Sequence, residues 1–193
     1  MNERSIKCVV VGDGMVGKTC LVLRYMMGDN GEFEKYIPTI ADEYTAKVTV
    51  KNTQVIFNLW DTAGQEEFKN LRKASYPVTD VFLVCFAVDN KDAFRNVEDM
   101  WIPEVTQYCP NAAVILVGTK ADTRIKMSNL NSVLTDQTVS YAMGKKMAKK
   151  WKLYDYVECS AKTGEGVKSV FDMAIKAGLN PRKFKKGHGC LVM

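Results

Sequence analysis

The sequence predicts an α/β fold of three layers, in which helices cover both faces of a mostly parallel six-stranded sheet with one antiparallel strand. Three observations lead to it. Apolar runs alternate with helix-compatible segments along the chain, which is typical of α/β proteins. Residues 81–88 and 112–118 are continuous apolar runs, as strands buried on both faces should be. Residues 44–60 contain two strand-like segments around a turn, which predicts an antiparallel hairpin.

The first half of the chain begins with a strand and a helix. IKCVVV at 6–11 is apolar and β-branched, so it predicts a buried strand, and a helix-compatible segment follows at 18–27. Residues 44–50 alternate apolar and polar side chains, and the turn-like KNTQ leads into VIFNLW at 55–60. These two segments are the predicted hairpin.

The second half alternates strands with helices. The two apolar runs predict central strands, and the helical patterns between and after them predict covering helices. YVECS reads as a short last strand before a closing helix. The predicted elements are strands at 81–88, 112–118 and 156–160, and helices at 92–108, 138–150 and 165–177.

Length, charge and cysteine usage bound the class of protein. The 193 residues fit one domain, expected at 1–178, with a flexible tail at 179–193. The tail has four basic residues and no acidic one, and without them the chain has 23 basic and 22 acidic residues. Because a nucleic-acid groove needs its basic charge on the folded body, we expect no nucleic-acid partner. Six cysteines without a C-x-x-C pair, and one histidine, argue against a zinc site.

GDGMVGKT at 12–19 matches the phosphate-binding pattern G-x-x-x-x-G-K-[ST], and it lies between a predicted strand and a predicted helix. Its glycines let successive backbone N–H groups point at a phosphate, and the helix start adds positive potential. Lys18 is expected to reach the β- and γ-phosphates, and the Thr19 hydroxyl to bind Mg²⁺.

Three further motifs follow the ends of later predicted strands: DTAGQE at 61–66, TKAD at 119–122 and CSAK at 159–162. The carboxyl ends of parallel strands converge on one crevice, so these motifs should surround one nucleotide. The Asp122 carboxylate can accept hydrogen bonds from guanine N1–H and its N2 amine. Adenine lacks this pair of donors, so guanine is the expected base.

This set of motifs resembles the Ras superfamily of small GTPases, with its P-loop GTPase fold. LWDTAGQEEF, SYPVTDVFLVCF, WIPEV, CPN and ILVGTKAD are similar to the Rho family, as are Trp60 and the threonine that opens TKAD. The resemblance spans the chain from about Ser5 to Met193. It implies a switch that binds GTP or GDP with Mg²⁺, hydrolyses GTP and signals, by this likeness, to the actin cytoskeleton.

The resemblance also assigns roles to individual residues. Thr39, in YIPTI, would be the second hydroxyl ligand of Mg²⁺, and Asp61 would hold the ion through water. Gln65 would orient the attacking water, so that Gln65, Lys18 and Thr39 form the catalytic set. Loss of the γ-phosphate would release Thr39 and Gly64 and relax both loops. The residues expected around the nucleotide are Asp13, Gly14, Met15, Val16, Gly17, Lys18, Thr19, Cys20, Tyr36, Thr39, Gly64, Lys120, Asp122, Ser160, Ala161 and Lys162.

The C-terminal Cys190-Leu-Val-Met is a C-a-a-X motif. Its last residue favours farnesyl, whereas Rho relatives often carry geranylgeranyl. A lipid on Cys190 and the basic tail would together provide the two signals that anchoring at an anionic membrane requires. MNERSIK has no signal-peptide apolar core, so the protein is expected in the cytoplasm and on the cytoplasmic face of the cell membrane.

The expected partners, by resemblance, are guanine-nucleotide exchange factors, GTPase-activating proteins, a GDP-dissociation inhibitor and GTP-dependent effectors such as kinases or formins. Residues 123–138 resemble the helical insert of Rho proteins. No motif places an arginine that could stabilise the transition state from within the chain, so intrinsic hydrolysis should be slow. Two alternatives stay open: a scaffold that holds GTP without turnover, and a P-loop nucleoside or metabolite kinase.

Overall fold

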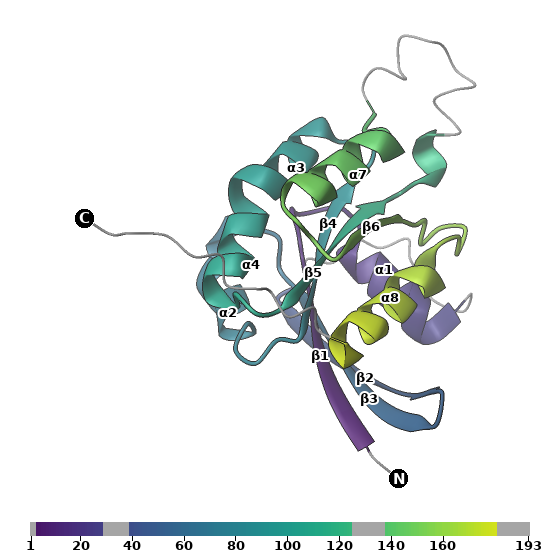
Figure 1. Ribbon diagram of the computed structural model, residues 1–193. Helices are drawn as coiled ribbons and strands as arrows, with labels where there is room; N and C mark the ends of the chain where they lie inside the picture. The colour runs from purple at the N-terminus through teal and green to yellow at the C-terminus, as the bar shows by residue number, and fades with distance from the viewer. Residues whose placement is uncertain (1–2, 29–38, 125–137, 181–193) are drawn as a thin grey trace.

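The computed structural model describes residues 3–28, 39–124 and 138–180 and has three layers around one sheet (Figure 1). The six strands lie in the order β2-β3-β1-β4-β5-β6, and only β2 runs antiparallel to its neighbour. The fold class predicted from the sequence is therefore confirmed. The strands are β1 (Glu3–Val11), β2 (Ala41–Val50), β3 (Thr53–Thr62), β4 (Val81–Ala87), β5 (Ala113–Thr119) and β6 (Asp155–Glu158).

Helices cover both faces of this sheet. Figure 1 shows α1 and α8 together on one face, and the remaining helices on the other. The bounds are α1 (Lys18–Met27), α2 (Lys69–Ala74), α3 (Lys91–Asn96), α4 (Ile102–Tyr108), α7 (Tyr141–Lys150) and α8 (Val167–Leu179), with a 3-10 turn η2 (Glu66–Phe68) and a π-helical segment η3 (Val97–Trp101).

The core lies on both sides of the central strands. Every residue of β4 and β5 is buried, which is why these two segments are continuous apolar runs in the sequence. β2 alternates exposed and half-buried residues at the edge of the sheet. Its register with β3 confirms the predicted hairpin, but β2 and β3 extend three and two residues further at their outer ends, to Ala41 and Thr62.

The helix expected at 92–108 is helical throughout but is not regular. Between α3 and α4 the chain widens into η3, where the Ile102 N–H donates to the Val97 carbonyl five residues earlier. Pro103 follows directly and has no N–H of its own to donate to the preceding turn. The helical turns η2 and α2 were not predicted, because their sequence EEFKNLRKA is polar and carries little apolar periodicity.

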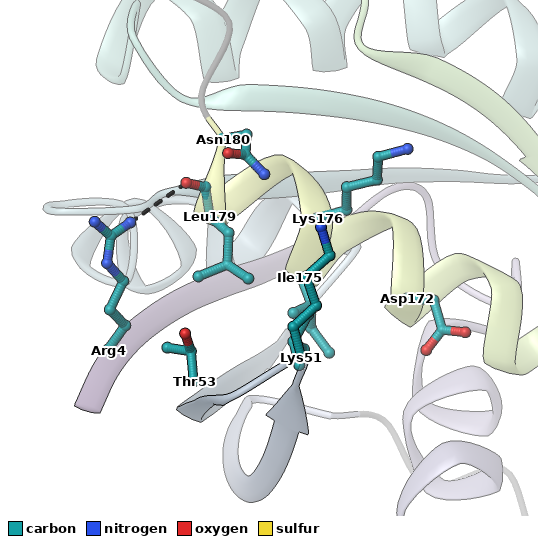
Figure 2. Close-up of a pocket in the computed structure, with 9 residues that line it drawn as sticks. Arg4, Lys51, Thr53, Asp172, Ile175, Lys176, Leu179 and Asn180 are labelled. Atoms are coloured by element: carbon teal, nitrogen blue, oxygen red, sulfur yellow. Dashed lines mark hydrogen bonds between the residues drawn. The ribbon is translucent and has the colours of Figure 1, made fainter. Parts of the chain in front are cut away.

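A cavity of about 610 Å³ lies at the edge of the sheet where β1 begins (Figure 2). Arg4, the turn residue Lys51, and Lys176 and Leu179 near the end of α8 are among its lining residues. The phosphate loop and the other motif loops leave the opposite edge, at the carboxyl ends of the parallel strands. This cavity is therefore separate from the candidate nucleotide site. Within the described residues, no helix combines the length and the apolar character that crossing a membrane requires.

Candidate functional site

The phosphate loop connects β1 to α1, and two of its glycines are required by their surroundings. A side chain at Gly12 would place a Cβ 2.2 Å from the Cys85 carbonyl oxygen, and the φ of Gly12 is +141°. Gly17 has a φ of 92° and precedes the first residue of α1. Because L-residues rarely adopt these conformations, the loop can curl closely against β4 only with glycine at both positions.

Lys18 is buried inside this curl. Its Nζ donates to the carbonyl oxygens of Gly12 and Asp13, both at 2.8 Å. Burial lowers the pKa of Lys18, whereas the charge of Asp61 acts in the opposite direction. An ammonium group has three donors, so these two contacts hold it in the loop and leave one N–H for a phosphate.

Oxygen ligands gather beside Lys18. The Thr19 and Thr39 hydroxyl oxygens are 2.7 Å apart, and the Thr19 hydroxyl donates to Asp61 Oδ2 at 2.5 Å. Thr39 Oγ1 lies 3.3 Å from the same carboxylate oxygen. Burial raises the pKa of Asp61, while hydrogen bonding from Thr19 and the charge of Lys18 oppose the rise.

These residues fit a magnesium ion. Asp61 Oδ1 is buried and has no hydrogen-bond partner among the described residues. Two hydroxyls and one carboxylate are hard oxygen donors, and Mg²⁺ typically combines one or two carboxylates with substrate phosphates and water. Within residues 3–28, 39–124 and 138–180 no group of three His, Cys, Asp or Glu residues could hold a metal. A site with one carboxylate and two hydroxyls is consistent with that finding.

The loop after β3 brings Gln65 to the phosphate loop. The Ala63 N–H donates to the Ile40 carbonyl at 3.3 Å, which joins this loop to the segment that carries Thr39. An ideal Cβ at Gly14 would lie 3.9 Å from Gln65 Cγ, so the two residues are neighbours without a side chain at position 14. The loop that carries Gln65 therefore lies beside both the phosphate loop, which precedes Lys18, and the segment that carries Thr39.

The residues expected to recognise the base follow the ends of β5 and β6. The Ser160 hydroxyl donates to Asp122 Oδ1 at 2.6 Å and orients the carboxylate. The Ala121 N–H donates to the Cys159 carbonyl at 3.1 Å, so the TKAD and CSAK loops are fastened together. Thr119 Oγ1 donates to the Val16 carbonyl at 2.5 Å, which ties this end of the site to the phosphate loop.

Other predicted residues lie around the same loops in different ways. Lys120 has a φ of 56°, and its Cε lies 3.9 Å from an ideal Cβ at Gly17, so its stem runs beside the phosphate loop. Met15 is exposed and also has a positive φ, whereas Val16 points into the core. Cys20 and Ala161 are half-buried and Lys162 is exposed. Tyr36, Cys190 and residues 125–137 of the expected insert lie outside the described residues.

Sequence reasoning placed Asp13 at the nucleotide, but its side chain is held by a different part of the chain. Both its oxygens accept hydrogen bonds, from Asn96 and from Trp101. Arg72 was missed altogether, although its guanidinium donates to the carbonyl oxygens on either side of Gly64. In the sequence, the one signal for this contact is the tryptophan of the Rho-like motif WIPEV, which the structure places against Arg72.

The order of these loops agrees with a comparison against known families. A family model described as the Ras family matches residues 7–180. The match begins at residue 7, within β1, extends through α8 and includes every described motif loop. Because it covers most of the chain, this protein belongs to the Ras family, whose members are small GTPases.

Proposed function

We propose that this protein is a Rho-like small GTPase, a switch that cycles between GTP and GDP and hydrolyses GTP slowly at a lipid-anchored position on a membrane. The main support for the switch function is the arrangement of two sets of residues in one site. Lys18, Thr19, Thr39, Asp61 and Gln65 gather at one end, and Asp122 lies at the other end. The first set suits a triphosphate, and the oriented carboxylate suits guanine.

Each residue has a defined task in hydrolysis. The Lys18 ammonium, held by two loop carbonyls, neutralises charge on the β- and γ-phosphates. Thr19, Thr39 and Asp61 would hold Mg²⁺, which supplies further positive charge to the bound phosphates. Gln65, beside Gly14, orients the attacking water, and a larger residue at position 14 would occupy the space that its side chain uses.

The arginine that contacts the main chain of Gln65 does not act as a transition-state arginine. Arg72 is fully buried, and each of its three nitrogens donates a hydrogen bond to protein oxygens. Its contact with Gln65 itself is to the main-chain carbonyl. An arginine supplied by an activating partner could therefore raise the rate by about 10³–10⁵. Exchange factors, a GDP-dissociation inhibitor and GTP-dependent effectors such as kinases or formins complete the proposed cycle.

The test of this function is single-turnover hydrolysis of GTP in Mg²⁺ by the purified chain. We expect measurable turnover by the wild type and loss of turnover in Gln65→Leu, with GTP binding kept. Gln107→Leu, the same substitution on the exposed face of α4, is the matched control and should behave as wild type. Binding without turnover by the wild type would favour a scaffold. Equal competition by ATP would favour a nucleoside or metabolite kinase.

The Rho-like assignment and the membrane anchor rest on sequence. Trp60, Trp101 in WIPEV and the C-a-a-X cysteine support them. Activation by a Rho-type activating domain, and not by a Ras-type one, would establish the Rho-like branch. For the anchor, Cys190→Ser should move the protein from membranes to the soluble fraction of cells, while Cys109→Ser should not. Membrane association that persists in Cys190→Ser would refute the anchor.

A further inference from the structure

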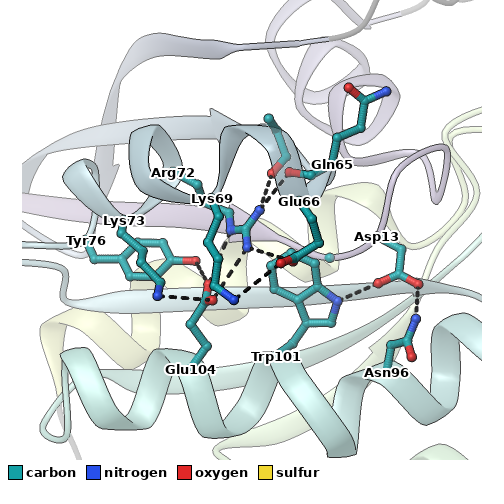
Figure 3. Close-up of polar contacts among 12 residues, drawn as sticks. Asp13, Gln65, Glu66, Lys69, Arg72, Lys73, Tyr76, Asn96, Trp101 and Glu104 are labelled. Atoms are coloured by element: carbon teal, nitrogen blue, oxygen red, sulfur yellow. Dashed lines mark hydrogen bonds and ion pairs between the residues drawn. The ribbon is translucent and has the colours of Figure 1, made fainter.

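Asp13 presents a problem of charge, because it is a carboxylate within a loop that should bind a polyphosphate. The structure solves it by giving each carboxylate oxygen its own donor. Asn96 Nδ2 donates to Oδ2 at 2.7 Å, and Trp101 Nε1 donates to Oδ1 at 2.6 Å (Figure 3). These donors direct the negative charge toward the helical segment formed by α3, η3 and α4, and they fix the phosphate loop to that segment.

The loop that carries Gln65 is fixed by Arg72. Nη1 of this buried guanidinium donates to the carbonyl oxygens of Ala63 at 3.1 Å and Gln65 at 3.3 Å. These two contacts hold the main chain on both sides of Gly64. Figure 3 shows the Gln65 side chain extending away from the guanidinium, so Arg72 fixes the position of the residue without engaging its amide.

Arg72 is itself held against α4. Its Nε lies 3.2 Å from Glu104 Oε1, and the Tyr76 hydroxyl donates to the same oxygen at 2.7 Å. Glu104 is 8% exposed, and Arg72 and Tyr76 are fully buried. Breaking a buried ion pair leaves an uncompensated charge, so this arrangement is rigid.

Trp101 contacts both Asp13 and Arg72. Its indole N–H holds Asp13, and its ring face lies under Arg72, with the guanidinium carbon 4.5 Å from the ring centroid. Trp101 is fully buried and is the last residue of η3, where the widened turn sets its direction. One side chain therefore contacts the phosphate loop through its edge, and through its face the arginine of α2 that holds the Gln65 loop.

We propose that Trp101 is a positioning residue for GTP hydrolysis, which holds the phosphate loop and the Gln65 loop to one point so that Gln65 keeps a fixed position relative to the γ-phosphate. The inference rests on the proposed function. Its specific content is that Trp101 affects hydrolysis more than nucleotide affinity, because Lys18, Thr19 and Asp122 bind the nucleotide without it. A displacement of about 1 Å in the Gln65 loop can reduce a rate on the order of 10²-fold.

The main test is Trp101→Phe, which keeps an aromatic face for Arg72 and removes the N–H that Asp13 accepts together with part of the indole ring. We expect the single-turnover rate of GTP hydrolysis to fall about tenfold, while the dissociation rate of fluorescent GDP changes by less than about twofold. Trp151→Phe is the matched control, because it also removes an indole N–H, one that donates to Glu98 Oε1 at 3.3 Å on the exposed surface. This control should hydrolyse GTP at the wild-type rate.

A double-mutant cycle tests whether Asp13 and Arg72 both act through Trp101. Asp13→Asn replaces one acceptor oxygen by a donor, and Arg72→Lys keeps the charge but loses the fork of donors. If both act through Trp101, the loss in the double variant will be smaller than the product of the two single losses. If Asp13 and Arg72 act independently, the fold-losses in hydrolysis rate of the two single variants will multiply in the double variant, and that result would overturn the proposal.

The remaining outcomes are equally decisive. Hydrolysis of GTP by Trp101→Phe at the wild-type rate would overturn the proposal. A fall in hydrolysis rate accompanied by equally large falls in GDP affinity and in the unfolding midpoint would also overturn it, because it would show a purely structural role. The chain has three tryptophans, so the Trp101 indole resonance can be assigned from its absence in Trp101→Phe. The Trp101 indole N–H resonance should shift in Asp13→Asn, because Asp13 accepts its hydrogen bond. If the unmodified protein hydrolysed no GTP, the proposed function would fail, and this resonance would show separately whether the contacts form.

Discussion

Replacing Gly64 by alanine tests how closely the Gln65 loop must approach the phosphate loop. An ideal Cβ at Gly64 would lie 2.4 Å from the Gly14 nitrogen and the Asp13 carbonyl carbon, and 2.5 Å from the Gly12 carbonyl oxygen. All three atoms belong to the backbone of the phosphate loop, which is held by Lys18 and by the contacts of Asp13. The methyl group therefore cannot be accommodated by rotation of a neighbouring side chain.

The magnitude follows from these distances. Ordinary van der Waals contact begins at 3.4 Å, so a contact of 2.4 Å requires the two loops to separate by about 1 Å. Gln65 is the next residue and must move with the loop. Because a misplacement of about 1 Å can reduce a rate on the order of 10²-fold, the barrier to hydrolysis should rise by about 2.7 kcal/mol.

Single-turnover hydrolysis and GDP dissociation measured in parallel separate this effect from general damage. We expect Gly64→Ala to hydrolyse GTP about 100-fold more slowly while GDP dissociates within a few-fold of the wild-type rate. Gly14→Ala is the comparison for steric overlap, because a Cβ at position 14 would meet only Gln65 Cγ, at the ordinary contact distance of 3.9 Å. GDP binding by this variant should be unchanged. Hydrolysis by Gly64→Ala within about twofold of wild type would refute the close-approach argument.

Three further predictions concern the base, the core and pH. In Asp122→Asn the amide oxygen can still accept from Ser160, which turns the NH₂ group toward guanine donors. GDP affinity should fall about 10- to 100-fold, and xanthosine diphosphate should compete better than in wild type. Gly144→Ala places a Cβ 2.2 Å from Tyr156 Cζ. Urea unfolding should show a loss of about 1–2 kcal/mol, because overpacking exceeds the helix-propensity gain; a stabilised variant would contradict this. Burial raises the pKa of Cys159 from 9.0 to about 12. The folded state keeps this proton while the unfolded state loses it, so the free energy of unfolding should fall between pH 9 and 12, more steeply than in Cys159→Ala.

Much of the fold was predictable because it depends on local patterns. β4 and β5 are buried on both faces and so appear as uninterrupted apolar runs. The hairpin of β2 and β3 was recognisable from alternation around a turn. Strand ends were less predictable: Ala41 and Asp42 are exposed and belong to β2 only because they pair with Thr62 and Asp61.

The residues of the candidate site could be predicted from two kinds of sequence information, local spacing and position after a strand. Gly12, Gly17, Lys18 and Thr19 lie in one contiguous segment, the phosphate loop and the start of α1, so their spacing in the sequence already determined their arrangement. Residues such as Gln65 and Asp122 could be placed because each follows a strand whose carboxyl end reaches the same edge of the sheet.

The sequence by itself predicted which chemical groups should meet a nucleotide, because motif spacing and the geometry of parallel strands bring those groups to one end of the sheet. Only the tertiary structure decided how those groups are held. Asp13 and Trp101 are 88 positions apart, and Arg72 lies in a polar segment that looks solvent-exposed. A buried arginine over an indole ring arises from the packing of α2 against η3 and α4, and no local pattern encodes that contact.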